Sequence, residues 1–325
     1  MTAIDRFRAD LDALAPPDAR LGIALSGGPD SLALLVLAAA ARPGMVEAAT
    51  VDHALREGSR AEAEAAAAIC AHLGVPHAVL TAEWDEKPAT AIQERARTER
   101  YRLLAAWARD RGLEAILTGH HADDQAETLL MRLNRGAGVR GLAGMRPKSA
   151  IPSPRHSREG GNPALLRPLL TWRRSDLERI CAEANLTPIA DPSNADDRYE
   201  RVRVRKALSD AGWIDSSALA TSAAHLASAD EALDWAVDQE WRRSISEADG
   251  GLAYTPSGAP EEILRRLVAR AIAALAHEGA AEPLRARELH PLIATLMAGG
   301  HATLRGVRCG GGAQWRFSKA PQRRG

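Results

Sequence analysis

Short apolar runs alternate with helical stretches along the first half of the chain. The apolar runs predict buried strands at residues 21–25, 48–51, 78–80 and 115–117. The segments of helical composition between them are 32–40, 59–73 and 90–111. Strands that are apolar along their whole length, separated by helices, are typical of a parallel sheet covered on both faces. We therefore expect an α/β fold built on a parallel sheet.

The pattern changes twice in the second half. Residues 151–163 are rich in Gly, Pro, Ser and Arg without hydrophobic periodicity, which predicts a flexible insertion at about 149–164. Periodic Leu and Ala after Trp213 predict a smaller, mainly helical domain over 213–325, following a first domain over 1–212. The helices and closing short strands that we expect in this half are 172–185, 197–211, 218–243, 261–277, 286–297, 303–308 and 314–317.

Composition adds little to this picture. The 325 residues are 46% hydrophobic and 26% charged, as in ordinary soluble domains. The formal net charge is zero, so only the locally basic stretches 198–206 and 301–325 favour contact with nucleic acid. Three cysteines far apart predict neither a disulfide framework nor a CxxC site. Since there is no leader-like or membrane-spanning apolar run, we expect a cytoplasmic protein with no membrane contact.

The string Ser-Gly-Gly-Pro-Asp-Ser at 26–31 stands between the first strand and a helix. Two glycines let the backbone approach a ligand, and a helix N-terminus directs N–H groups and partial positive charge there. A Gly-Gly turn alone is a common tight connection, but the complete string after a buried strand predicts a phosphate-binding loop. Residues 52–53 follow the second strand at the same ligand-binding edge. The expected nucleotide-binding residues are Ser26, Gly27, Gly28, Pro29, Asp30, Ser31, Asp52 and His53.

A second polar cluster, at 118–128, follows the fourth strand. On a helix, His120, Asp124 and Glu127 would share one face. Two histidines and two aspartates could form a divalent metal site. Alternatively, the carboxylates bind Mg²⁺ and orient the substrate while His120 lies near the nucleotide. In a purely structural interpretation, one aspartate caps the helix and His121 is exposed.

Arginines form two further candidate groups. Arg97 and Tyr101 share a helix face, where the guanidinium could bind a phosphate in the bidentate manner; a solvated face is the alternative. Arg201, Arg203 and Arg205 alternate along a predicted helix, so not all of them can point at one ligand.

In this order, the motifs resemble the tRNA(Ile)-lysidine synthase family of the pyrophosphate-loop ATPase superfamily. The strings that carry the resemblance are Ser-Gly-Gly-Pro-Asp-Ser at 26–31, Val-Asp-His at 51–53, Ala-Arg-x-x-Arg-Tyr at 96–101, Thr-Gly-His-His-Ala-Asp-Asp at 118–124, Arg-Gly-Ala-Gly at 135–138, Arg-Pro-Leu-Leu at 167–170 and Asp-Pro-Ser-Asn at 191–194.

This resemblance implies a Rossmann-like, adenine-nucleotide-binding catalytic domain followed by a domain that contacts tRNA. It also implies ATP-dependent ligation of free L-lysine to C2 of the wobble cytidine of a tRNA(Ile) with a CAU anticodon. The cytidine is first adenylated, with release of pyrophosphate, and the lysine amine then displaces AMP. The product, lysidine, changes the codon read from AUG to AUA.

The resemblance also implies residue roles. Backbone N–H groups of 27–31 would hold pyrophosphate, while Asp30 and Asp124 would bind Mg²⁺. Glu127 would help to hold the lysine. The residues expected around ATP and the adenylated intermediate are His120, Arg97 and Arg205.

Four other functions compete with this one. A tRNA thiolation enzyme would need paired cysteines, and synthetases for GMP or NAD lack the His-His-x-Asp-Asp string. A non-catalytic nucleotide-binding module would not need Asp30 and Asp124. A metal-dependent phosphohydrolase leaves the loop at 26–31 without a role; its metal would be held by His120, His121, Asp123 and Asp124.

Overall fold

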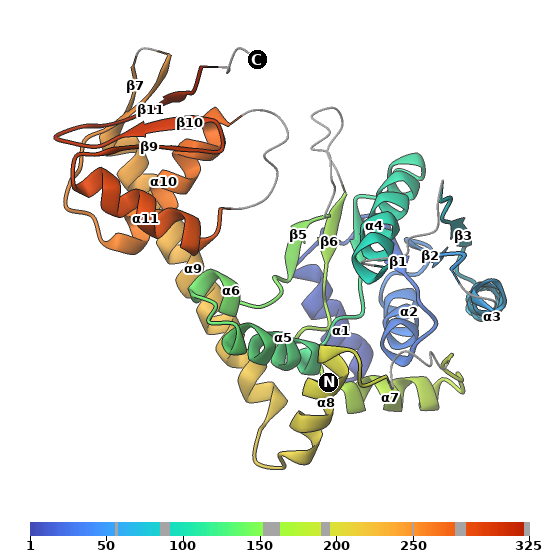
Figure 1. Cartoon of the computed structure of the whole chain (residues 1–325). Helices are drawn as coiled ribbons and strands as arrows, with labels where there is room; N and C mark the ends of the chain where they lie inside the picture. The colour runs from blue at the N-terminus through green and yellow to red at the C-terminus, as the bar shows by residue number, and fades with distance from the viewer. Residues whose placement is uncertain are drawn as a thin grey trace. The chain divides into compact units, whose positions relative to one another are not determined.

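The chain forms two compact units, Met1–Ala227 and Ser228–Gly325. The computed structural model describes residues 1–55, 58–84, 92–151, 163–189, 196–248, 250–276 and 284–321. The turn expected at 191–194 and most of the expected insertion lie outside these residues. The units divide within helix α9 (Ser216–Ser244), whereas the sequence analysis placed the boundary near 212, before this helix. A change in composition marks where α9 begins, whereas the two units divide part-way along this continuous helix, which is labelled in Figure 1.

The first unit contains a six-stranded sheet in the order β3-β2-β1-β4-β6-β5 (Figure 1). Its strands are β1 (Leu21–Ala24), β2 (Val46–Asp52), β3 (His77–Thr81), β4 (Ala115–Leu117), β5 (Lys148–Ala150) and β6 (Ala164–Leu166). All neighbours pair in parallel except β5 and β6. The four strands expected from apolar runs are confirmed. The parallel sheet forms because each of the first strands is followed by a helix that returns the chain to the same starting edge.

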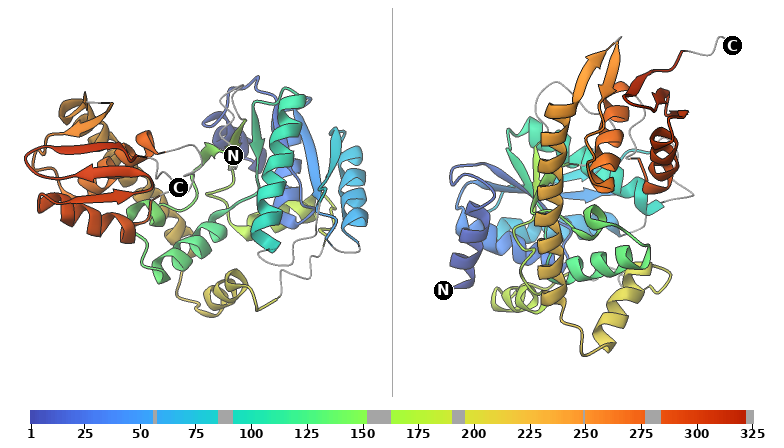
Figure 2. Two further views of the ribbon diagram at one scale, coloured as in Figure 1. Left: turned by 45° about the horizontal axis from the view of Figure 1, so that its top comes forward. Right: turned by 90° about the vertical axis from the view of Figure 1, so that its left-hand side faces the viewer.

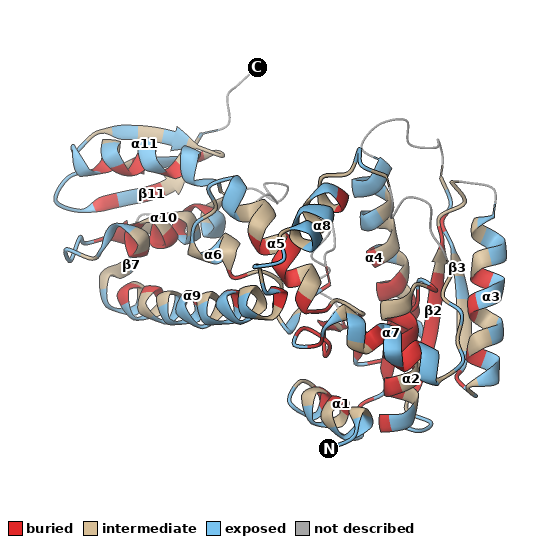
Figure 3. Cartoon of the chain, turned by 90° about the horizontal axis from the view of Figure 1, so that it is seen from below, coloured by how far each residue is buried: buried red, intermediate tan, exposed pale blue. Residues whose placement is uncertain are grey.

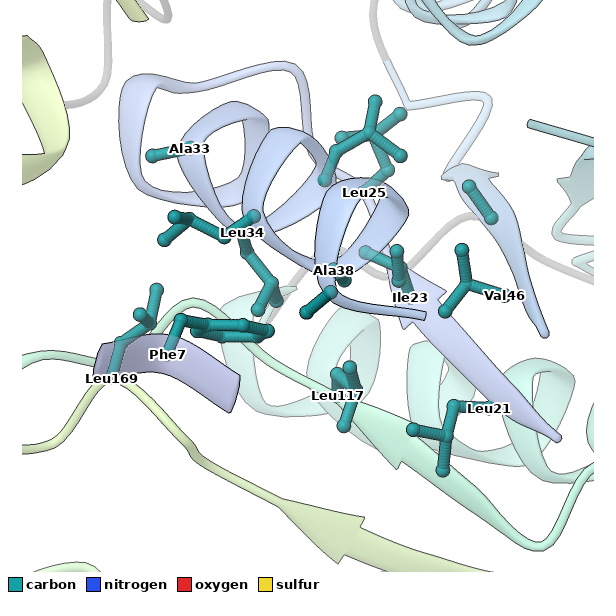
Figure 4. Close-up of a cluster of buried hydrophobic side chains, with 14 of the residues drawn as sticks. Phe7, Leu21, Ile23, Leu25, Ala33, Leu34, Ala38, Val46, Leu117 and Leu169 are labelled. Atoms are coloured by element: carbon teal, nitrogen blue, oxygen red, sulfur yellow. The ribbon is translucent and has the colours of Figure 1, made fainter. Parts of the chain in front are cut away.

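Helices cover both faces of this sheet (Figure 2, left). The helices in these layers are α1 (Ala3–Asp12), α2 (Pro29–Ala41), α3 (Ser59–His72), α4 (Ile92–Asp110) and α7 (Arg174–Glu183). The unit also contains α5 (Ala122–Asn134), α6 (Val139–Leu142) and α8 (Glu200–Asp210), of which α6 and α8 contact α5. Helix α2 is buried on almost every side, because it lies between α1, α7 and β1. Figure 4 shows Leu34 and Ala38 of this helix beside Ile23 of β1. Such packing explains why its sequence carries no charge after the first turn.

A separate cluster lies on the opposite face of the sheet. Tyr101, Leu104 and Trp107 of α4 pack there against Ile116 of β4 and Leu165 of β6. Burial is greatest in the strands and in the inward faces of α2 and α7, while the outer face of α3 is exposed (Figure 3). The sheet therefore has two hydrophobic faces, and its strand ends are left to carry polar groups.

The second unit contains a five-stranded antiparallel sheet in the order β7-β8-β11-β10-β9. Its elements after α9 are β7 (Ile245–Ala248), β8 (Gly251–Tyr254), α10 (Glu261–Leu275), α11 (Ala286–Met297), β9 (His301–Leu304), β10 (Val307–Gly310) and β11 (Trp315–Lys319). The expected helices are present, but the sheet is larger than expected. Residues 303–308 form parts of two strands joined by a turn at Arg305 and Gly306, both with positive φ.

The core of this second unit includes Leu267, Leu296, Tyr254 and Phe317. The hairpin β7–β8 was missed because its eight strand residues gain an apolar face only when β8 pairs with β11. None of the described helices is both long enough and apolar enough to cross a membrane.

Candidate active site

The turn between β1 and α2 has a backbone that only glycine suits. Gly27 has φ +79°, and a Cβ there would lie 2.4 Å from Ile189 Cδ1. Ile189 N–H also donates to Gly27 O at 2.9 Å, so a later segment crosses directly over the turn. Gly28 is the N-cap and Pro29 the first residue of α2, a position at which the missing proline N–H costs nothing.

Two serine hydroxyls shape this loop. Ser31 Oγ accepts from Ser26 N–H at 3.2 Å and donates to Gly28 O at 3.0 Å. The two hydroxyl oxygens are 3.1 Å apart. Ser31 is buried and Ser26 is exposed, so Ser31 supports the turn while Ser26 faces outward. The first N–H groups of α2 have no acceptor within the helix, as at any helix N-terminus.

The loop after β4 packs directly on the first turn of α2. A Cβ at Gly119 would lie 2.8 Å from Asp30 O and 3.1 Å from Ser31 N. Since β4 pairs with β1, the two strand ends are neighbours, and glycine permits their loops to touch. The two polar motifs seen in the sequence are thus brought into contact.

His121 lies at the centre of this contact. It is 3% exposed and is the N-cap of α5. Its Nε2 is 3.5 Å from Asp30 Oδ1 and 3.6 Å from Asp124 Oδ2, while its Nδ1 is 3.5 Å from Asp123 Oδ2. The structural interpretation with an exposed His121 is therefore wrong, because the loop packs on α2 and encloses the imidazole.

The three carboxylates hold a positive charge on His121. Burial lowers its pKa, but hydrogen bonding to Asp123 and Asp30 and the charge of Asp124 outweigh burial and raise the pKa to about 10. Burial conversely raises the pKa of Asp123, and its contacts with His121 and Arg174 N–H more than reverse this effect. At neutral pH His121 is therefore an imidazolium that faces the side chains of Asp30, Asp123 and Asp124.

His120 has the opposite charge state. Burial lowers its pKa to about 4; Asp124 acts against the shift, while Arg167, Arg201 and Arg97 add to it. Its Nδ1 is 2.9 Å from Thr118 Oγ1. His120 is therefore a neutral imidazole next to a charged one.

Helix α8 contributes two arginines to the carboxylates of α5. Arg201 donates to Asp124 Oδ1 at 2.9 Å and to Glu127 Oε2 at 2.6 Å. Arg205 donates to Glu127 Oε1 at 2.6 Å, and Glu127 is only 2% exposed. Arg203 points elsewhere and donates to the backbone carbonyl of residue 197, as the alternating spacing predicts. The sequence analysis assigned no role to Arg201, although its i, i+4 relation to Arg205 on a helix is the signal that could have found it.

A group of cations surrounds Tyr101 of α4. The guanidinium carbons of Arg97 and Arg100 lie 5.0 and 5.6 Å from the ring centroid, so Arg97 and Tyr101 share a face as expected. Arg167, which follows β6, is buried and donates to Arg146 O at 2.7 Å. Burial lowers the pKa of Arg167, and the charge of Arg97 lowers it further. Arg100 and Arg167 were named only within longer motifs in the sequence.

A cavity of about 350 Å³ lies at the carboxyl ends of β1 and β2. Its lining includes Ser26, His53 and Arg100, together with Ala24, Leu25, Ala49, Thr50, Val51, Leu55, Ser59, Glu62 and Leu104. Asp52 does not line it: its buried Oδ1 accepts from Ala54 N–H at 2.9 Å and Ser59 Oγ at 2.6 Å. Asp52 therefore shapes the turn, while His53 faces the cavity.

No group of three or more His, Cys, Asp or Glu side chains in the described part of the chain could hold a metal ion. This contradicts the four-residue metal site considered for His120, His121, Asp123 and Asp124. The physical reason is that the side chains face separate partners: His120 Nδ1 is 2.9 Å from Thr118 Oγ1, while His121 lies between the carboxylates of Asp30, Asp123 and Asp124.

Comparison with known proteins agrees with the motifs. Residues 3–211 match the family model described as a PP-loop domain. The chain is 48% identical to a tRNA(Ile)-lysidine synthase from Novosphingobium aromaticivorans, over 99% of this chain and 95% of that protein. The chain belongs to the tRNA(Ile)-lysidine synthase family. A second family member, from Zymomonas mobilis, is 41% identical over 95% of this chain and 91% of its own length.

The tRNA(Ile)-lysidine synthase family thus accounts for both units, since the matched relatives cover nearly the whole chain. Family membership makes this chain a tRNA-modifying ligase with an ATP-binding PP-loop domain.

One solved structure with the same fold is a U34-tRNA thiolase from Methanococcus maripaludis with its [4Fe-4S] cluster. It has a TM-score of 0.56 and 15% identity, and the match covers 69% of this chain and 79% of that one. At this identity the likeness supports the Rossmann-like fold alone. All three cysteines of this chain, Cys70, Cys181 and Cys309, are buried and unpaired.

Proposed function

We propose that this chain uses ATP to ligate L-lysine to C2 of the wobble cytidine of tRNA(Ile) with a CAU anticodon. The observation that carries the proposal is the contact between the loop at 26–31 and the His-His-x-Asp-Asp loop, beside a nucleotide-sized cavity. Membership of the synthase family supports the same reaction. ATP, free lysine and tRNA all meet in the cytoplasm, which is the location that we propose.

ATP would bind with its adenosine in the cavity and its phosphates at the N-terminus of α2. The cavity is bounded by Leu25 and Ser26 of the loop and by residues at the end of β2. Backbone N–H groups of 27–31 would then face the phosphates, where helix N-terminal charge stabilises anions. The pyrophosphate that leaves would remain bound by the same N–H groups.

The carboxylates fit a magnesium ion that binds together with ATP. Asp30 Oδ1 is buried and, apart from His121 Nε2 at 3.5 Å, faces no donor among the described residues. Mg²⁺ commonly takes one or two protein carboxylates and completes its shell with phosphate oxygens and water. Asp30 and Asp124 would hold the ion, which would offset charge on the phosphates.

Arginines and His120 would surround the cytidine and its adenylate. Arg97 and Arg205 would stabilise negative charge at the α-phosphate, and neutral His120 can donate or accept a hydrogen bond without repelling them. Glu127 would hold a lysine ammonium group, exchanging this cation for the guanidinium groups that now occupy its oxygens. The lysine nitrogen would bond to C2 as the C2–O bond breaks, AMP would leave with that oxygen, and the proton of the nitrogen would pass to solvent.

The tRNA would reach the site through its anticodon loop. An anticodon base is already unpaired, so its presentation costs less than extrusion from a duplex. The second unit and the basic C-terminal stretch would contact tRNA phosphates. We do not assign residues that read the sequence of the tRNA.

One assay tests the reaction directly. Incubating the full chain with ATP, labelled lysine and tRNA(Ile) bearing CAU should give lysine-dependent labelling of the tRNA, with AMP and pyrophosphate as products. A tRNA(Met) with the same anticodon and a reaction without lysine are the controls. Formation of ADP, or labelling that does not require ATP, would contradict the proposal.

A further inference from the structure

His121 connects two elements that the reaction needs in a fixed relation. One ring nitrogen, Nε2, faces Asp30 of α2 at 3.5 Å and Asp124 of α5 at 3.6 Å. His121 is only 3% exposed. Water therefore cannot take the place of the imidazole unless the two loops separate. Asp30 and Asp124 carry like charges and repel each other, so neither side chain could keep the other in this position.

Asp123 fixes the orientation of the imidazole. Its Oδ2 is 3.5 Å from the other ring nitrogen of His121 and accepts from Arg174 N–H at 2.9 Å. Arg174 is the first residue of α7, and α7 packs along α2. Asp123 is thus anchored to α7, and α7 packs against α2, the helix that carries Asp30. These contacts form a closed ring from His121 through Asp123, α7 and α2 back to His121.

Without the imidazole, three carboxylates would face one another across a partly buried space. Like charges at such distances repel strongly where the surroundings exclude water. Asp30, with a side chain 35% exposed, is the member free to rotate toward solvent. The aspartate of the phosphate loop would then leave the reacting phosphates, although the adenosine cavity would be unchanged.

We infer that His121 and Asp123 form a positioning pair that holds the carboxylates of Asp30 and Asp124 at one point. This inference rests on the proposed function, because the two aspartates act on the phosphates of ATP there. Neither member of the pair lines the nucleotide cavity. Their removal should therefore slow the adenylation step and leave nucleotide affinity nearly unchanged.

The test compares His121→Gln and Asp123→Asn with the wild-type protein. We expect kcat for pyrophosphate release to fall at least tenfold in both variants, with KM for ATP within threefold. Calorimetric binding of α,β-methylene-ATP without Mg²⁺ should give a Kd within threefold of wild type, because the adenosine cavity is unchanged. His72→Gln is the matched control, since His72 is exposed at the C-terminal end of α3 and does not line the cavity; its kcat should stay within twofold.

A second measurement separates positioning from packing. Imidazole added to the His121→Gly variant should raise its rate of pyrophosphate release at least tenfold. Thiazole, a ring of similar size without an N–H group, should not raise this rate. Equal rescue by both rings would overturn the inference, because filling the space would then suffice. If the His121 variants do not fold, the Asp123→Asn variant alone tests the inference, through its kcat for pyrophosphate release and its KM for ATP.

The outcomes also separate this inference from the proposed function. An inactive wild-type protein that binds ATP would contradict the proposed function. An active wild type with kcat within twofold in the Asp123→Asn variant would overturn the positioning pair and leave the function standing.

Discussion

Two neighbouring histidines show how much one residue's surroundings decide. His120 and His121 are adjacent and chemically identical, yet one is neutral and the other charged at pH 7. The difference comes from partners: arginines add to the effect of burial at His120, whereas three aspartates reverse it at His121. The sequence predicted that this dipeptide belongs to a site, but not which nitrogen would meet which carboxylate.

At the same scale, Asp30→Ala and Asp124→Ala should each lower turnover more than tenfold while the protein stays folded. Loss of one electrostatic stabiliser costs about 3 kcal/mol in comparable sites. Rates of AMP formation and circular dichroism would test this, with exposed Asp110→Ala as the control. Rates close to wild type in both variants would remove these aspartates from the catalytic group.

Glu127→Gln should act on lysine rather than on ATP. The change removes the charge that would bind an ammonium group and that now pairs with Arg201 and Arg205. We expect KM for lysine to rise about tenfold, as for loss of a charge-assisted contact worth about 1.4 kcal/mol, with KM for ATP within threefold. Exposed Glu94→Gln is the control, and an unchanged KM for lysine would exclude this role.

At the scale of elements, the site depends on how closely two loops approach. Strands β1 and β4 and helices α2 and α8 were predicted from the sequence pattern, and the glycines at 27 and 28 from their motif, whereas α5 was considered only as one possibility for 118–128. The need for glycine at 119 was not predicted, because it arises from α2 backbone atoms 2.8 to 3.1 Å from where its Cβ would be. Helix α8 similarly meets α5 only in the folded chain.

Gly119→Ala should therefore separate the two loops. An overpacked contact of this kind costs about 1–3 kcal/mol of unfolding free energy, and we expect a loss of adenylation at least as large as from Asp123→Asn. Gly212→Ala is a matched control, since among the described residues, its chain neighbours aside, no atom lies within 4 Å of its Cβ position. Thermal unfolding and turnover of both variants test this; equal behaviour would show that the backbone shifts without cost.

Shortening the connection between β5 and β6 should leave adenylation intact. Ala150 and Ala164 pair directly in the antiparallel ladder, so a short turn can join the strands. Replacing residues 153–161 with four Gly and Ser residues retains buried Ile151 and should keep kcat within threefold. Loss of activity in a folded variant would show that the segment has a catalytic role.

On the scale of the whole molecule, the two units have separate hydrophobic cores. The second unit is additionally held by an ion-pair cluster between α9 and α10. Arg266, 8% exposed, lies 2.7 Å from Asp230, 2.8 Å from Asp234 and 2.7 Å from Glu262. A helical pattern alone does not distinguish this buried arginine from the solvated arginines around it.

Arg266→Met should destabilise the second unit selectively. Removing one partner of a buried ion pair costs about 3–5 kcal/mol, because the carboxylates remain uncompensated. Arg270→Met, which removes a half-exposed pair with Asp238, should cost about 1 kcal/mol or less. Urea unfolding followed at several probes tests this, and equal losses in the two variants would contradict the assignment.

Helix α1 and strands β5 and β6 were not predicted, and β5 overlaps the insertion expected at about 149–164. Strands β1 to β4, helices α2, α3, α4, α7 and α8, the loop motif at 26–31 and the family were readable in the amino-acid sequence. They depend on residues that are neighbours along the chain, so hydrophobic period and motif spacing are sufficient. The tertiary structure alone decided that His121 faces three aspartates, that Arg201 and Arg205 cover Glu127, and that a five-stranded sheet completes the second unit. These features join residues far apart in sequence, such as Arg201 and Glu127 at a separation of 74, and such contacts exist only once packing has brought the elements together.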